Sequence, residues 1–295
     1  MKNRRDFLKR AVGAAAASAA MGTHQSQAAG RLAWPGPIGL EMYTVRYQFA
    51  KAPAETLKGV AAAGYKEIEA AAFLPMNLSV AEFKKEIAKD GLTSPSGFLE
   101  VPMNGDEWKK SVEQAKAFGW KYVVVAFVEL ADADRWKRLA DLFNQCGRTC
   151  RDAGIQFCYH NHLREFAKVG STCGYDILLT NCDPALVKME MDIFWITFAG
   201  ADPLPYFKRY PGRFPLLHIK DMKKDAVGST TEFPPDSGPN PFAAVGQGKI
   251  EWAKIFAHVH EAGAKHIFVE QDRSDGSPLE AIKTSYDYLR KLRGS

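Results

Sequence analysis

Short apolar runs alternate with longer amphipathic stretches along most of the 295-residue chain, and this alternation constrains the fold more than any other feature. Eight runs have the length of buried strands, at residues 37–43, 66–70, 92–99, 121–127, 155–160, 187–192, 214–219 and 265–270. Eight stretches with helical spacing lie between or after them, at 53–63, 80–90, 106–118, 133–152, 173–181, 202–209, 250–262 and 278–292. Such alternation predicts a parallel sheet with right-handed crossovers.

Several residues mark where the predicted helices begin and end. Ser79 and Glu82 have the spacing of a capping box at the start of the second helix. Glycines stand where a helix should stop before the next strand, at Gly64, Gly91, Gly119, Gly154 and Gly263.

Two folds fit an alternating pattern, a closed barrel and an open doubly wound sheet. Eight strand–helix units in this length favour a single-domain (β/α)₈ barrel over residues 29–295. The open sheet would need a glycine-rich phosphate turn after the first strand, where this chain reads EMYTVR. The later GQGK at 246–249 follows a loop and therefore does not indicate nucleotide binding.

Residues 1–28 have the composition of an export signal that is cleaved from the mature protein. A basic start is followed by the small-residue stretch AVGAAAASAAMG and by a Ser-x-Ala cleavage pattern that ends at Ala28. The run Arg4-Arg5-Asp6-Phe7-Leu8-Lys9 closely resembles a twin-arginine signal. That resemblance implies export of the folded protein to the periplasm by the twin-arginine machinery.

Charge and apolar content exclude some classes of partner. Residues 1–28 carry five basic side chains and one acidic one, so their removal would lower the net charge from +5 to about +1. We therefore expect no general nucleic-acid surface. No apolar run reaches the roughly 20 residues that cross a bilayer, so we expect no stable membrane association. An odd number of cysteines, five, leaves at least one thiol unpaired.

Ionisable residues stand at the ends of most predicted strands. In a (β/α)₈ barrel these ends form the catalytic mouth, so the side chains should share one polar pocket. The residues concerned are Glu41, Glu69, Glu100, His160, His162, Asp192, His218, Lys220, Glu270 and Asp272.

Four of them follow strongly apolar residues and should be partly desolvated: His160, Asp192, His218 and Glu270. Buried carboxylates without compensation are costly, and one divalent cation would pair all four side chains. Two imidazoles and two carboxylates suit Mn²⁺, Co²⁺, Mg²⁺ or Zn²⁺ alike. We favour His160 as the ligand of strand five and His162 as a residue near the metal or substrate; the opposite assignment is also open.

An ordered set of motifs resembles the sugar phosphate isomerase/epimerase family, the xylose-isomerase-like barrels. The motifs are GLEMYTVR, GYKEIE, GIQFCYHNHLREF, MEMDIFW, LLHIKD, GQGKIEW and FVEQD, and the resemblance covers essentially all of residues 36–290. The resemblance implies one divalent metal held by the same four positions, His160, Asp192, His218 and Glu270. In ketose epimerases of that family the strand-five ligand is a glutamate, so His160 departs from the two-carboxylate mechanism.

The resemblance also implies the chemistry, which is proton abstraction beside a metal-bound carbonyl to give an enediolate. Reprotonation would isomerise or epimerise a sugar, whereas loss of a β-substituent would make the enzyme a dehydratase or a 3-keto-glycoside lyase. Candidate catalytic residues are Glu270 as base, Lys220 and Glu165. Candidate substrate contacts are His162, Trp195, Glu69, Glu41 and Arg46. Without a recognisable phosphate cradle, an unphosphorylated sugar or keto-sugar is favoured.

Residues 222–248, rich in Pro, Gly and Ser, form a long predicted loop that a barrel would place over the mouth.

Two other functions are alternatives to a sugar isomerase. A metal-free periplasmic sugar-binding barrel is an alternative of another class. An abasic-site endonuclease fits neither export nor the small net charge.

Overall fold

The computed structural model describes residues 34–71, 79–102, 104–126 and 132–292. The predicted export signal therefore lies outside the described residues. Within the described part of the chain, no helix is both long and apolar enough to cross a membrane.

Eight parallel strands of the described chain close into a barrel, which confirms the predicted fold class. Around the barrel the order is β1-β12-β9-β8-β5-β4-β3-β2. The strands are β1 (Gly39–Glu41), β2 (Glu67–Ala70), β3 (Thr93–Phe98), β4 (Tyr122–Ala126), β5 (Gln156–His160), β8 (Val187–Asp192), β9 (Leu216–Ile219) and β12 (His266–Val269). Each coincides with one of the eight predicted runs.

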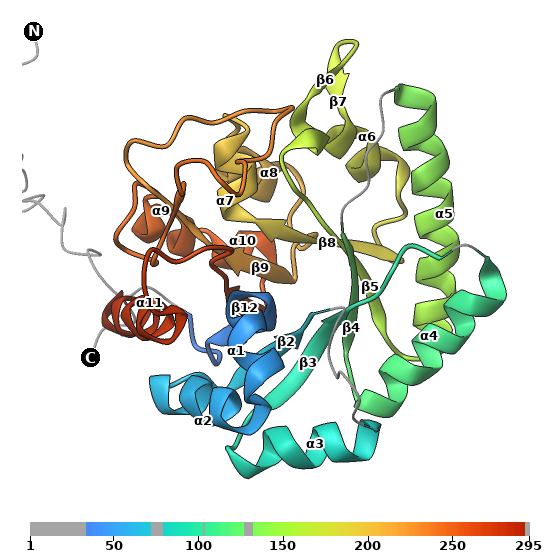
Figure 1. The fold of residues 1–295 in the computed structure, drawn as a ribbon. Helices are drawn as coiled ribbons and strands as arrows, with labels where there is room; N and C mark the ends of the chain where they lie inside the picture. The colour runs from blue at the N-terminus through green and yellow to red at the C-terminus, as the bar shows by residue number, and fades with distance from the viewer. Residues whose placement is uncertain (1–33, 72–78, 103, 127–131, 293–295) are drawn as a thin grey trace, which may run out of the picture.

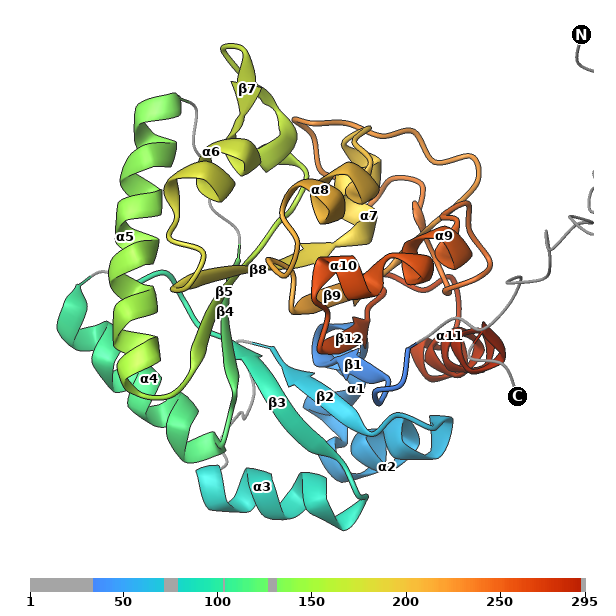
Figure 2. The same ribbon diagram turned by 180° about the vertical axis from the view of Figure 1, so that it is seen from behind.

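Helices surround the barrel as an outer layer, as Figures 1 and 2 show from opposite sides. The predicted helices correspond to α2 (Pro53–Ala63), α3 (Val80–Lys89), α4 (Gly105–Phe118), α5 (Ala133–Asp152), α6 (Gly174–Asn181), α8 (Pro203–Arg209) and α11 (Pro278–Leu292). The helix expected at 250–262 is divided into α9 (Trp252–Ala257) and α10 (Val259–Ala262). Short elements that the pattern did not predict are η1 (Met42–Val45), α1 (Arg46–Lys51), η2 (Arg164–Phe166), α7 (Ile193–Phe198) and the hairpin β6 (Lys168–Val169) with β7 (Thr172–Cys173).

Local signals in the sequence behave as expected. Ser79 Oγ accepts from the backbone N–H of Glu82 at 3.2 Å, and Glu82 Oε2 accepts from the backbone N–H of Ser79 at 2.8 Å. Gly64 ends α2 with φ of 118°, and a Cβ there would lie 2.3 Å from the ring of Tyr286. All five cysteines are free thiols, and Cys146 and Cys150 are buried in the core.

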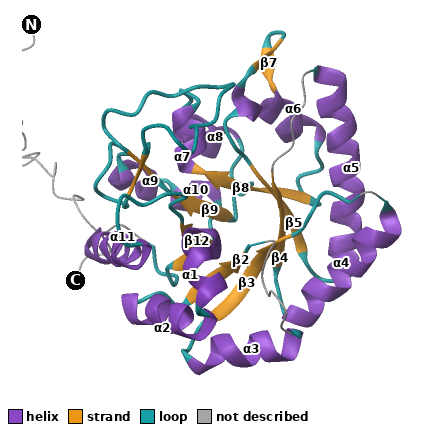
Figure 3. Cartoon of the chain, in the orientation of Figure 1, coloured by secondary structure: helices purple, strands orange, loops and turns teal. Residues whose placement is uncertain are grey.

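The long loop predicted after the seventh strand is held at both ends. A two-stranded hairpin of β10 (Asp221–Met222) and β11 (Phe242–Ala243) brackets residues 223–241, which run as loop on the α7–α9 side of the barrel (Figure 3). The buried Asp221 carboxylate accepts from the backbone N–H groups of Gly246 at 2.8 Å and Gly248 at 3.1 Å. The GQGK turn therefore wraps a carboxylate of the chain itself.

The middle of this loop is attached to residues beyond the end of β12. Arg273 Nη1 donates to the carbonyl oxygens of Pro235 and Asp236 at 3.1 and 2.5 Å, and Nη2 donates to that of Pro239 at 3.2 Å. Arg164 Nε donates to the Thr231 carbonyl at 3.1 Å. These bonds hold the loop where Phe233 and Pro234 line the cavity described next.

Candidate metal centre and substrate cavity

A cavity of about 460 Å³ lies at the carboxyl ends of the barrel strands. Its polar lining includes Glu41, His160, His218, Glu270 and Asp272, contributed by β1, β5, β9 and the segment after β12. Volumes of about 300–1,000 Å³ are typical of sites for small molecules. The predicted catalytic mouth is therefore a real concavity with charged residues on its wall.

Three of the four predicted metal ligands have donor atoms close together. One donor atom each from Asp192, His218 and Glu270 lies within 4.8 Å of the other two. His218 Nδ1 is 2.8 Å from Glu270 Oε2 and 3.9 Å from Asp192 Oδ2. The fourth, His160, faces the same carboxylate, with Nε2 3.8 Å from Asp192 Oδ2. We call these four residues the outer group.

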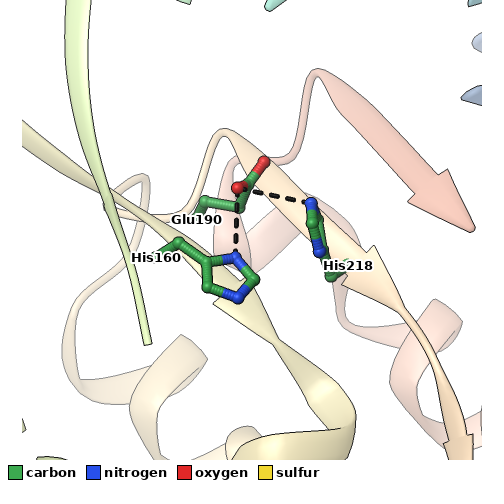
Figure 4. A group of neighbouring side chains, drawn as sticks. All are labelled: His160, Glu190 and His218. Carbon is green, nitrogen blue, oxygen red and sulfur yellow. Dashed lines mark hydrogen bonds and ion pairs between the residues drawn. The ribbon is translucent and has the colours of Figure 1, made fainter. Parts of the chain in front are cut away.

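A second set of neighbouring donors lies on the other side of the two imidazoles. Glu190 Oε2 is 3.2 Å from His160 Nδ1 and 3.3 Å from His218 Nε2 (Figure 4). Glu190 was missed in the sequence because it stands inside β8, two residues before Asp192, and only strand ends were considered. The signal was present, since residues two apart in a strand point to the same side.

Among the described residues, the outer group contributes the most cavity-lining side chains to a candidate cation site. His160, His218 and Glu270 line the cavity, whereas Asp192 and Glu190 are fully buried and do not line it. Asp192 Oδ2 is buried and accepts no hydrogen bond from the described residues, although Lys220 Nζ lies 3.1 Å away. An unsatisfied buried carboxylate oxygen beside two imidazoles and a second carboxylate fits a divalent cation.

Lys220 is a buried cation behind this group. Its ammonium lies 2.7 Å from Glu270 Oε2, 3.1 Å from Asp192 Oδ2 and 3.2 Å from Asp272 Oδ1. Burial opposes its charge, but the three carboxylates outweigh that effect and raise the pKa of Lys220 well above its usual value.

The pKa values of the neighbouring ionisable groups also depend on burial and on the charges around them. Burial alone would raise the pKa of Glu270, yet Lys220 and His218 hold it well below its usual range. Burial raises the pKa of Asp272 to about 7 despite the attraction of Lys220. Burial also lowers the pKa of His160, with His218 adding repulsion, and lowers that of His162 to about 3. Both of these histidines are therefore neutral, as metal ligands and hydrogen-bonding groups require.

Aromatic rings form the part of the cavity wall near His162. The ring of Trp195 lies 5.5 Å from that of His162 and 5.3 Å from that of Phe233, measured between centroids. His162 stands in the turn after β5, and both His162 and Trp195 line the cavity. Figure 4 shows the ring of His160 directed at Glu190 of the neighbouring strand.

Three predicted pocket residues lie elsewhere. Glu69 is fully buried behind His218, with Oε2 2.6 Å from His218 Nε2, so it does not reach a substrate. Glu165 is buried away from the cavity lining, where Oε1 accepts from Tyr159 Oη at 2.6 Å and from the backbone N–H of His162 at 3.0 Å. Glu100 is exposed and follows the end of β3 by two residues. Strand-end position alone did not distinguish inward from outward or sideways side chains.

Glu41, Arg46 and Trp195 do line the cavity, as expected. Arg46 Nη1 donates to the carbonyl oxygens of Tyr43 at 2.7 Å and Asp272 at 3.0 Å. Lys220 does not line it, so its contact is with the carboxylates that do.

Known proteins share both the sequence pattern and the fold. Inosose dehydratase from Lacticaseibacillus casei is 29% identical over 163 residues, which cover 53% of this chain and 54% of that protein. The chain thus spans about half the length of the curated relatives it matches. A sugar phosphate isomerase/epimerase from Parabacteroides distasonis ATCC 8503 superposes with a TM-score of 0.73 at 25% identity, over 89% of this chain and 96% of that one. The IolI protein, solved with a bound zinc atom, has a TM-score of 0.68 at 16% identity, over 88% and 98% of the two chains.

The family profile of the xylose isomerase-like TIM barrels matches residues 57–292, which include every residue of the outer group. With its closed eight-stranded barrel, the chain belongs to the xylose isomerase-like TIM barrel family.

Proposed function

We propose that the protein is a divalent-metal-dependent enzyme that isomerises or epimerises an unphosphorylated sugar or keto-sugar by removing a proton beside a carbonyl group. The observation that carries this proposal is the outer group, in which His160, His218 and Glu270 line the cavity and Asp192 lies behind them. A cation held by these residues would act as a Lewis acid toward a substrate carbonyl.

Glu270 is the proposed base. It lines the cavity, and the neighbouring Lys220 and His218 keep it deprotonated, so it can accept a proton from a sugar carbon. The same neighbours make it a weak base, because they stabilise its charged form. The Lys220 ammonium contacts the carboxyl groups of both Glu270 and Asp272 and so holds the Glu270 carboxylate in place.

The charge of the lining favours a substrate without phosphate. Four carboxyl groups line the cavity, Glu41, Asp236, Glu270 and Asp272, and those that are ionised, Glu270 among them, would repel a phosphate dianion. Its two guanidinium groups, Arg46 and Arg273, each donate to backbone carbonyls of the protein. An aromatic wall opposite polar groups suits a sugar, which has apolar C–H faces and hydroxyl edges.

Elimination is the second candidate reaction for the same site. The match to inosose dehydratase supports it, since a dehydratase begins with the same proton removal and then expels a hydroxyl group. A 3-keto-glycoside would lose its glycosidic substituent in the same way. Isomerisation and elimination therefore differ only in the fate of the enediolate that proton loss leaves.

The test combines metal content with hydrogen exchange. We expect about one divalent ion per chain by elemental analysis, and its loss in His160→Ala and Glu270→Ala. In D₂O, the metal-loaded protein should incorporate deuterium into ketoses or 3-keto sugars, and Glu270→Ala should slow this by about 10²–10⁴-fold. Sugar binding without metal and without exchange would reject the enzyme and favour a sugar-binding barrel.

A further inference from the structure

Both imidazoles of the outer group contact a buried glutamate on the side away from Asp192. His160 places Nδ1 3.2 Å from Glu190 Oε2 and Nε2 3.8 Å from Asp192 Oδ2. His218 places Nε2 2.6 Å from Glu69 Oε2 and Nδ1 3.9 Å from Asp192 Oδ2. The two histidines therefore use opposite ring nitrogens toward the same carboxylate.

We propose that Glu69 and Glu190 are positioning residues, which present Nδ1 of His218 and Nε2 of His160 to a divalent cation. A neutral imidazole carries its proton on one nitrogen and ligates through the other, so a fixed acceptor on one side selects the ligating nitrogen. The inference rests on the metal centre of the proposed function and not on the reaction that it catalyses.

The two glutamates are themselves held in place. Both are fully buried, so neither side chain can exchange its imidazole partner for water. Ser96 Oγ donates to Glu69 Oε1 at 2.5 Å, which leaves Oε2 directed at His218. Glu190 Oε2 lies 3.2 Å from His160 Nδ1 and can accept its proton, and it also lies 3.3 Å from His218 Nε2, whose own closer partner is Glu69 (Figure 4).

The alternative arrangement would place the cation between His160 Nδ1, Glu190 and His218 Nε2. That position would direct the ligating nitrogens of both imidazoles away from Glu270, which lines the cavity and lies 2.8 Å from His218 Nδ1. The outer position instead includes Glu270 and Asp192 together with both histidines.

The first experiment needs no variant. The purified protein, labelled with ¹⁵N-histidine and loaded with Zn²⁺, is studied by long-range ¹H–¹⁵N correlation. We expect His160 to be protonated at Nδ1 and ligated at Nε2, and His218 to show the reverse. The same nitrogen ligating in both histidines, or His218 ligating through Nε2, would overturn the proposal.

The second experiment measures Zn²⁺ affinity by competition with a chelator. Glu69→Met and Glu190→Met should each weaken Zn²⁺ binding by about 10–100-fold, with the corresponding Gln variants in between because they keep an acceptor. Affinities within twofold of the original would overturn the proposal, and so would complete loss in Glu190→Met as in Asp192→Asn, which would make Glu190 a ligand. This experiment measures Zn²⁺ affinity and not turnover. A protein without catalytic activity would therefore contradict the proposed function, while the comparison of Zn²⁺ affinities would still test the roles of Glu69 and Glu190.

A matched control exists on the same strand. Glu67 Oε2 lies 2.8 Å from His266 Nδ1, which makes another glutamate–histidine pair two residues earlier in β2. Neither residue belongs to the groups with metal-ligating geometry among the described residues. Glu67→Met should therefore leave Zn²⁺ affinity unchanged, and a loss equal to that of Glu69→Met would show a general effect on the barrel.

Discussion

At the scale of single residues, Lys220 has the strongest electrostatic effect on the site. Its side chain is 1% exposed and contacts three carboxylates. Removing one member of a buried ion pair leaves its partners charged and desolvated, at a cost of about 3–5 kcal/mol. We therefore expect Lys220→Met to lower the metal-free protein's free energy of unfolding by about this amount, measured by urea denaturation.

Divalent cations should restore part of that loss. A cation between Asp192 and Glu270 would replace the missing positive charge, so Mn²⁺ should stabilise Lys220→Met more than it stabilises the original protein. Lys220→Arg, which keeps the charge, is the control. Equal stabilisation of both proteins by Mn²⁺ would show that the ammonium and the cation do not balance the same carboxylates.

Glu165 offers a test of a buried carboxyl outside the cavity. Burial raises its pKa, although hydrogen bonds from Tyr159 and from the His162 backbone oppose the shift. A raised pKa means that the fold favours the protonated form. The contribution of Glu165 to stability is thus present below the unfolded pKa, about 4.3, and is lost as pH rises through the folded value.

Glu165→Gln removes this titration and keeps an acceptor for the same donors. Its stability relative to the original protein should therefore increase as pH rises from about 4 to 8, measured by the midpoint of urea unfolding. Deuterium exchange into a substrate should stay within a few-fold. A stability difference that does not change with pH would contradict the raised pKa of Glu165. A loss of exchange as large as that of Glu270→Ala would instead support a role for Glu165 in acid–base catalysis.

At the scale of elements, the loop of residues 223–241 depends on a close contact at its base. A Cβ at Gly248 would lie 2.2 Å from Asp221 Oδ1 and 2.3 Å from the Met222 carbonyl oxygen. Overpacking of this kind costs about 1–3 kcal/mol. We expect Gly248→Ala to destabilise the protein by that amount and to expose residues 223–241 to limited proteolysis, followed by mass spectrometry.

Gly105→Ala is the matched control, because its Cβ would meet nothing within 4 Å and the residue begins α4. It should leave both stability and cleavage nearly unchanged. Cleavage of Gly248→Ala at the same rate as the control would mean that the Asp221 contacts do not hold the loop.

The elements of the barrel were predictable because each is encoded locally. Apolar runs such as 121–127 and 214–219 have the length of buried strands, and a glycine such as Gly119 ends the helix before the first of them. Helix α7 was missed because Asp192 both ends β8 and caps the helix through a bond from the Trp195 backbone N–H at 2.9 Å. No spacer residue separates the two elements.

The candidate site was only partly predictable for the same reason. His160, Asp192, His218 and Glu270 end or follow apolar strands, so their convergence could be inferred from the fold alone. The contacts of the two imidazoles with Glu69 and Glu190 were not predictable in this way. They depend on how strands that are distant in the sequence are aligned with one another in the barrel. His218 of β9 meets Glu69 of β2 across the barrel, a contact between residues 149 apart that no local pattern encodes.

At the scale of the whole molecule, we propose that the protein is exported after folding. Five of the basic side chains lie in residues 1–28, so the exported part would be nearly neutral. The residues of the candidate metal centre come from β5, β8, β9 and the segment after β12, so they come together only when the barrel closes. Folding before export would therefore let the protein acquire its cation where the metal supply differs from that of the periplasm.

The twin-arginine proposal makes a definite prediction about this order of events. Replacing Arg4 and Arg5 by lysine keeps the charge of the signal and removes the guanidinium pair that the export machinery reads. We expect this double variant to stay in the cytoplasm, by more than about tenfold in the periplasmic-to-cytoplasmic ratio of a cell fractionation, while it still folds and binds metal. Lys9→Arg is the control and should be exported. Export of both variants at equal rates would indicate an ordinary secretory signal, in which case the chain crosses unfolded and the cation must be acquired outside.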